Sequence, residues 1–262
     1  MSVNKNEYAN KVKEEINAWE KECPGYLSNV TSFVLWPAMK AAELLIFDAV
    51  TQTGSKVIEG CLNALLWDPD YTVADKDVIA TLKEKNNDFS SLKAVYNSDD
   101  LENMDLSADY YWNYNLVYAV AQGGANIPAL FTIVFRCIQQ IALCYGFDTS
   151  KDDEKVFMLG IISIASASDV ASKQAAMVFM RQIQVDITKK FAEEGGRAAI
   201  EPIVRQVAKT IGINLTKRKA HMLIPGIGAI AGASFDGMYL QDIARAAKNC
   251  YRKRKLEMLG KF

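Results

Sequence analysis

The sequence predicts an all-α protein, folded as a single helical bundle with a central buried apolar helical hairpin. No segment alternates apolar and polar residues as a strand would, and no tandem repeat occurs. Apolar residues make up 50% of the 262 positions, which is enough for a substantial core. Two segments are apolar on nearly every side, as helices at the centre of a large bundle are. We therefore expect one helical domain over residues 1–262.

The first arm of the hairpin is the most apolar helix-length segment, at residues 126–148. Pro128 suits the first turn of a helix, where its missing N–H removes no hydrogen bond, and Gly146 suits the left-handed position after the last turn. The segment carries one charge, Arg136. Because an unpaired buried charge is costly, we expect Arg136 to find a carboxylate or an open cavity.

The second arm follows a short loop and covers residues 156–165. Its start, Ser150 to Asp153, resembles a capping signal, and the acidic groups there suit the dipole of a helix N-terminus. A similar capping box, Thr72 to Asp75, predicts a short polar helix that ends near Lys85.

The remaining helices are predicted from apolar spacing. Apolar residues at positions 8, 12, 16 and 19 form one stripe of an amphipathic helix, and a second helical region runs from about residue 37 to residue 68. After the hairpin, Gly195-Gly196 separates an amphipathic helix from a helix over residues 198–211, and a final helix ends in the basic run Arg252-Lys253-Arg254-Lys255.

An aromatic run precedes the hairpin, and Tyr111, Tyr114 and Tyr118 are expected to share a helix face. Packing in or against the core is the plainer interpretation, while a ligand cleft and an interfacial belt are alternatives. Together with Arg136, Tyr114 and Tyr118 are therefore candidates for a ligand cavity.

The charges are distributed unevenly along the chain. Residues 1–172 contain 13 Lys and Arg against 24 Asp and Glu, whereas residues 173–262 contain 17 against 7. Either the basic C-terminal third meets an anionic surface, or the acidic front and the basic third neutralise each other on folding.

Two basic clusters could meet such a surface. They are Lys217, Arg218 and Lys219, and the tail Arg252, Lys253, Arg254 and Lys255. Each cation beside an anionic leaflet would contribute about 1 kcal/mol. We expect no nucleic-acid partner, because no recognised nucleic-acid fold accompanies these clusters and the acidic front would oppose one.

A glycine-rich segment lies between the two clusters. Gly226 and Gly228 fit the letters of a dinucleotide fingerprint, but no strand precedes them. Gly228 and Gly232, extended by Gly237, instead form a face of small residues that permits close helix packing or insertion into lipid.

Motifs for catalysis are scarce, and we expect no cofactor and no metal. His221 is the single histidine, so histidine-based zinc sites and catalytic triads would all depend on one residue. No phosphate-binding loop and no G-x-S-x-G motif occurs. The five cysteines form no C-x-x-C pair, no signal peptide opens the chain, and no stretch qualifies cleanly as a transmembrane helix. These features favour a cytoplasmic protein with reduced thiols.

Three blocks of the sequence resemble the EcsC family: Tyr145-Gly146-Phe147-Asp148, then Asp152-Asp153-Glu154 leading into Phe157-Met158-Leu159-Gly160, then Ile224-Pro225-Gly226-Ile227-Gly228-Ala229. The order of features is similar from about Tyr8 to Tyr251, with departures at residues 112–115 and in the acidic front. The resemblance implies a helical, bacterial, membrane-associated accessory protein, and it carries over no catalytic residue. A more distant similarity to senescence and spartin-type domains points the same way.

We therefore expect a non-enzymatic accessory protein, cytoplasmic or peripheral on the inner membrane face, that engages anionic lipid or a membrane protein through its basic third. One alternative is a soluble carrier or enzyme that holds an apolar ligand inside the bundle. Another is a secretion- or toxin-associated interaction protein.

Overall fold

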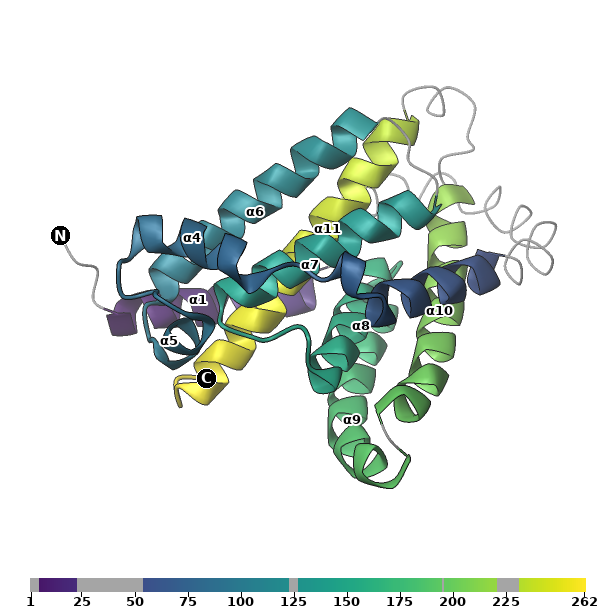
Figure 1. Ribbon diagram of the computed structural model, residues 1–262. Helices are drawn as coiled ribbons and strands as arrows, with labels where there is room; N and C mark the ends of the chain where they lie inside the picture. Colours follow the sequence, from purple (N-terminus) through teal and green to yellow (C-terminus); the bar gives the residue numbers. More distant parts are fainter. Residues whose placement is uncertain (1–4, 23–53, 123–126, 195, 221–230) are drawn as a thin grey trace.

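The computed structural model describes residues 5–22, 54–122, 127–194, 196–220 and 231–262 (Figure 1). Within these ranges most residues are helical and no strand is present, so the all-α prediction is confirmed. The elements are α1 (Lys5–Lys21), a helix over residues 54–67, the short 3-10 helix η1 (Pro69–Tyr71), α4 (Asp75–Lys85), α5 (Leu92–Asn97), α6 (Leu101–Gln122), α7 (Ile127–Cys144), α8 (Asp152–Ser166), α9 (Val170–Glu194), α10 (Gly196–Ala220) and α11 (Ala231–Met258).

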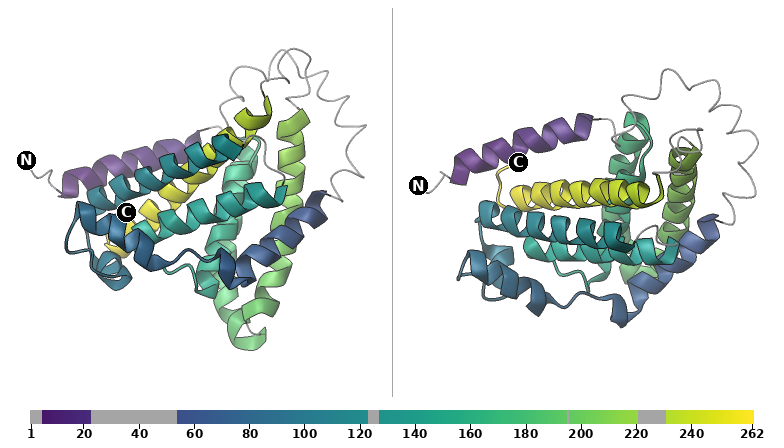
Figure 2. Two further views of the ribbon diagram at one scale, coloured as in Figure 1. Left: turned by 45° about the horizontal axis from the view of Figure 1, so that its top comes forward. Right: turned by 90° about the horizontal axis from the view of Figure 1, so that it is seen from above.

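The helices form two groups that cross at a steep angle. Helices α1, α6, α7 and α11 run roughly alongside one another, and α8, α9 and α10 stand across them (Figure 2). Helix α11 joins the two groups, because it packs against α6, α7 and α8 and also contacts α1. The core is continuous from α1 through α11. The final helix is thus the central element of the bundle.

Both arms of the predicted hairpin are buried. From Cys137 to Cys144 every side chain of α7 is buried, and in α8 the burial runs from Val156 to Ser166. The arms do not pack along their full lengths, however. Helix α7 packs mainly against α6 and α11, whereas α8 turns away and packs against α9, α11 and α10 (Figure 1).

The turn between the two arms forms as the sequence predicted. Gly146 has φ of 84°, its N–H donates to the Leu143 carbonyl at 3.0 Å, and the Phe147 N–H donates to the Ala142 carbonyl at 3.1 Å. These two bonds define a Schellman motif. A Cβ at Gly146 would also collide with the backbone of Tyr96, so both φ and close packing require glycine there.

The two predicted capping interactions do not form, and both helices begin later than those caps would place them. Helix α4 starts at Asp75 with Ala74 at the N-cap, which has no acceptor side chain. The Thr72 N–H, which a capping box would pair with Asp75, donates instead to the Pro69 carbonyl at 3.0 Å, and the Val73 N–H donates to Oε1 of Gln139 on α7 at 2.7 Å. Helix α8 starts at Asp152, and the Ser150 hydroxyl donates to Asp148 rather than capping the helix. Tertiary and turn contacts take these polar groups in preference to the caps.

Candidate functional site

The basic tail of α11 lies inside the protein. Arg252 is only 6% exposed, and its guanidinium contacts both carboxylate oxygens of Asp105 on α6. The shortest of these bonds joins Nη2 to Oδ2 at 2.6 Å, and Nη1 reaches Glu15 of α1 at 2.9 Å. The phenol hydroxyls of Tyr8 and Tyr145 donate to the Asp105 carboxylate at 2.7 and 2.6 Å. Arg252 therefore connects α11 with α1 and α6, and Asp105 extends this network to Tyr145 in the turn after α7.

The next two cations of the tail are also paired with acidic residues from earlier in the chain. Lys253 donates to Glu20 of α1 at 2.7 Å. Arg254 pairs with Glu154 in the first turn of α8. Burial raises the pKa of Glu154 to about 7, and Arg254 opposes this shift. Both pairs again bring together residues from the acidic front and the basic third.

Lys255 is fully buried, and no carboxylate of the described residues pairs with it. Its ammonium donates to the backbone carbonyls of Val95 and Tyr96, at 3.0 and 2.5 Å, in the last turn of α5. A cation suits this position because the carbonyls at a helix C-terminus are electronegative. Burial nevertheless lowers the pKa of Lys255 to about 8.

These contacts correct the prediction for the tail. Arg252 and Lys255 cannot reach an anionic leaflet while they are buried, and Lys253 and Arg254 are engaged by Glu20 and Glu154. For this part of the chain, the acidic front and the basic third neutralise each other within the fold. The sequence could not indicate that these four cations have partners within the fold, because the partners lie about 100 or more residues away in the chain.

The other predicted surface residues are described only in part. Lys217, Arg218 and Lys219 lie in the last turns of α10, and their side chains are outside the described part of the structure. Gly226 and Gly228 lie outside the described residues, and Gly232 is in the first turn of α11. Gly237 is a buried position of α11, as helix packing would require.

Arg136, the residue predicted to pair with a carboxylate or to face a cavity, lies at the surface of the protein. Arg136 is exposed, and its guanidinium carbon lies 5.8 Å from the ring centroid of Tyr114. Within the described ranges it pairs with no carboxylate. Arg136 occupies an outward position of α7, so its charge stays hydrated, and a cation–π contact replaces the expected ion pair.

The aromatic run on α6 is divided between two faces. Tyr111 is 6% exposed, and its hydroxyl lies 3.0 Å from that of Thr81 on α4. Tyr114 and Tyr118 are 43% and 41% exposed. Tyr111 therefore does not share their face, because the exposed tyrosines have a spacing of four and Tyr110, not Tyr111, belongs to their stripe.

This stripe is the candidate functional site, and we call it the α6 outer face. It comprises Leu106, Tyr110, Tyr114, Val117 and Tyr118, which are 41–70% exposed. The rings of Tyr110 and Tyr114 are stacked with centroids 6.4 Å apart. No charged residue occurs from position 110 to position 122, and the guanidinium carbon of Arg136 lies 5.8 Å from the Tyr114 ring centroid. A run of exposed apolar and aromatic side chains is typical of an interaction surface. The spacing of four residues can be read from the sequence, but the exposure of these side chains cannot.

The described residues offer little for metal or thiol chemistry. Among them no group of three or more His, Cys, Asp or Glu side chains could hold a metal ion. Burial raises the pKa of Cys137 and of Cys250 to about 12, which keeps these thiols protonated. Helix α7 is long and apolar enough to cross a membrane, but 72% of it is buried within the protein, so it equally fits a core helix.

Comparisons with known proteins agree with the resemblance seen in the sequence. A sequence model of the EcsC protein family matches residues 10–256. The protein named "Uncharacterized protein YdbA" from Bacillus subtilis (strain 168) is 22% identical over 93% of this chain and 94% of its own length. "Protein EcsC" from the same strain is 25% identical over 51% of each chain. No solved structure matches. Because the family match covers nearly the whole chain, the protein belongs to the EcsC protein family.

Proposed function

We propose that this protein is a non-enzymatic, membrane-associated accessory protein that lies on the cytoplasmic, inner face of a bacterial membrane. In this proposal the α6 outer face and the basic end of α10 contact anionic lipid. The observation that carries the proposal is the exposure of Tyr110, Tyr114, Val117 and Tyr118 on a stretch of helix without charge. Tyrosine suits a membrane interface because its ring is apolar and its hydroxyl remains hydrated.

The arrangement of the helices supports a single contact region. The C-terminal ends of α6 and α10 and the N-terminal end of α11 lie at the same end of the molecule (Figures 1 and 2). The last turns of α10 carry Lys217, Arg218 and Lys219. The helix that carries the tyrosines and the helix that carries the basic cluster thus end in the same region, and peripheral membrane proteins combine aromatic and basic residues to bind anionic leaflets.

The internal pairing of the tail narrows the proposal. Since Arg252 to Arg254 are neutralised by Asp105, Glu15, Glu20 and Glu154, the proposal assigns the contact with anionic lipid to the other basic cluster, at the end of α10. Three consecutive positions at the end of α10 contribute about 3 kcal/mol beside an anionic surface, which is enough for reversible attachment when combined with aromatic burial.

Co-sedimentation with liposomes tests the proposal. We expect the protein to bind vesicles of phosphatidylcholine with phosphatidylglycerol at low salt, and to bind phosphatidylcholine alone more weakly. Raising the salt to about 0.5 M should weaken binding, because the Debye length falls to a few ångströms. No binding to the anionic vesicles at low salt would overturn the proposal.

Matched variants locate the contact. The triple variant with Tyr110→Ser, Tyr114→Ser and Tyr118→Ser should bind vesicles about 10-fold or more weakly than the parent protein. The single change Tyr114→Ser should weaken vesicle binding more than Tyr71→Ser, a control that removes an exposed tyrosine from η1. Combined Lys217→Gln, Arg218→Gln and Lys219→Gln should reduce binding more than Lys76→Gln, Lys83→Gln and Lys85→Gln on α4. If each variant and its control weakened vesicle binding equally, a contact through the α6 outer face and the end of α10 would be refuted.

A further inference from the structure

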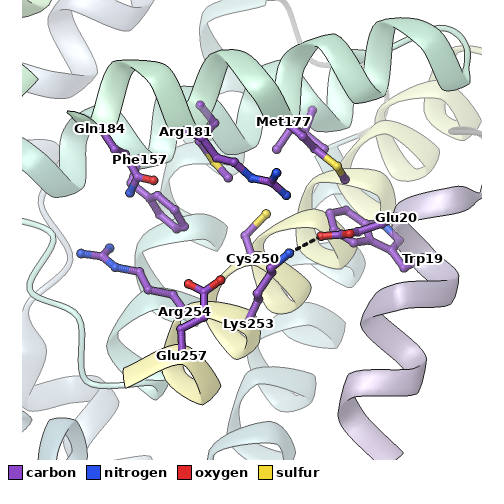
Figure 3. Close-up of a pocket in the computed structure, with 12 residues that line it drawn as sticks. Trp19, Glu20, Phe157, Met177, Arg181, Gln184, Cys250, Lys253, Arg254 and Glu257 are labelled. Atoms are coloured by element: carbon purple, nitrogen blue, oxygen red, sulfur yellow. Dashed lines mark hydrogen bonds and ion pairs between the residues drawn. The ribbon is translucent and has the colours of Figure 1, made fainter. Parts of the chain in front are cut away.

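A small pocket lies where four helices meet, on residues that the proposed membrane contact does not use. It has a volume of about 180 Å³ and opens between α1, α8, α9 and α11 (Figure 3). Trp19, Phe157, Met177 and Met180 provide aromatic and flexible apolar surface. None of the described side chains of α6 lines it. A ligand in this pocket would therefore be independent of the α6 outer face.

Most charges around the pocket are already paired. Lys253 donates to Glu20 at 2.7 Å, and Arg254 pairs with Glu154 while its guanidinium lies 4.8 Å from the ring centroid of Phe157. These contacts hold two cations of α11 in fixed positions at the rim. Neither is available as the principal partner of a ligand without breaking a pair.

Arg181 differs from these two cations. It comes from α9, and its side chain extends across the pocket towards α11 (Figure 3). Within the described part of the chain, its guanidinium forms no ion pair or hydrogen bond. A guanidinium beside aromatic and methionine side chains, with its donors still available, is suited to a planar anion that it can bind through two parallel hydrogen bonds.

Glu257 limits which anion can bind. Its carboxylate also lines the pocket and has no ion pair among the described residues. A dianion such as phosphate would place two negative charges against one unpaired arginine and close to this carboxylate. A monoanion gains the arginine contact with less repulsion.

We infer that the pocket binds a small amphiphilic carboxylate. Its carboxylate pairs with Arg181, and its apolar body contacts Trp19, Phe157 and the two methionines. The size follows from the volume, since a cavity of about 150 Å³ accommodates benzene, and the pocket measures about 180 Å³. Benzoate and hexanoate are therefore suitable probes.

Isothermal titration calorimetry of the full chain at pH 7.5 tests the inference. Hexanoate should bind at least about 10-fold more tightly than hexanol, because only the acid can pair with Arg181. Benzoate should behave like hexanoate, and inorganic phosphate should give no saturable binding. Equal affinities for hexanoate and hexanol, or no binding of either acid, would overturn it.

Two substitutions of opposite effect make the test specific. Arg181→Gln should weaken hexanoate binding about 10-fold or more, while the surface control Arg205→Gln should leave it unchanged. Glu257→Gln should strengthen binding a few-fold by removing a nearby negative charge. Arg181 and Glu257 are both exposed, so thermal melts of these variants should match the parent protein. Weaker hexanoate binding after Glu257→Gln would contradict the repulsion assigned to Glu257 and refute the preference for a monoanion.

Discussion

The tail of α11 buries charged side chains, whereas the α6 outer face exposes apolar and aromatic ones. Residues 252–255 are four consecutive cations, yet Arg252 is 6% exposed and Lys255 is fully buried. Val117 and Tyr110 of α6 are 70% and 51% exposed. The basic run is structural because each charge has a specific partner. The aromatic run is exposed because no described helix covers it, and that makes it the better candidate for binding.

The comparison shows when a cluster of charges indicates a surface. Burying an arginine is tolerated only when carboxylates and further hydrogen bonds compensate for lost hydration. Asp105 satisfies this condition, since it accepts from Arg252, Tyr8 and Tyr145. A basic run in a helix that ends against an acidic part of the same chain is therefore weak evidence for an external anionic partner.

The largest expected effect is the loss of Arg252. Arg252→Met should lower the free energy of unfolding by about 3–5 kcal/mol, because Asp105 would keep a buried charge without its cation. Urea denaturation measures the change. Adding Asp105→Asn should recover part of the loss, since the remaining group is neutral. The exposed control Arg205→Ala should cost less than about 1 kcal/mol. A similarly small loss for Arg252→Met would mean that the tail is not structural.

A smaller effect should appear in the pH dependence. Burial lowers the pKa of Lys255 from 10.5 to about 8, so between these values the unfolded chain binds more protons than the folded protein. Stability from this group should therefore rise with pH, by about 2 kcal/mol between pH 8 and pH 10. The difference between the parent protein and Lys255→Met, measured by urea denaturation across this range, isolates the contribution. A difference that is constant with pH would contradict the shift.

The smallest effect on stability is expected at the α6 outer face. Tyr114→Ser and Tyr118→Ser should each change the free energy of unfolding by no more than about 0.5 kcal/mol, as exposed substitutions usually do. Tyr111→Ser, on the buried side of the same helix, should cost about 2 kcal/mol or more. Chemical denaturation of the three variants checks this order. Equal losses at positions 111 and 114 would show that the outer face is covered.

Local signals in the sequence were sufficient for much of the fold. Pro128 and Gly146 predicted the limits of α7, because proline fits a first helical turn and the glycine adopts a positive φ. The apolar stripe of α1 was also correct, with Val12, Ile16 and Trp19 all buried. Such features depend on neighbouring residues, so one chain is enough to reveal them.

Which side chains are buried, exposed or line a pocket depended on contacts between distant segments, which no local sequence pattern contains. Arg252 and Asp105 are separated by 147 positions, and their pairing follows from how α11 crosses α6. The exposure of Arg136 depends on which side of α7 lacks a neighbour, and the pocket near Arg181 depends on four helices at once. Periodicity identifies a helix face, but only packing decides whether another element covers it.

The position of α11 in the chain also affects the order of folding during synthesis. Asp105, Tyr8 and Tyr145 are translated well before Arg252, so the nascent chain holds an acidic centre that lacks its counterion. Hydrophobic contacts among α6, α7 and α8 can form earlier, but their core surface stays uncovered until α11 leaves the ribosome. We therefore expect ribosome-bound chains that end before α11 to remain sensitive to protease and to associate with chaperones, and full-length chains to become resistant in one late step.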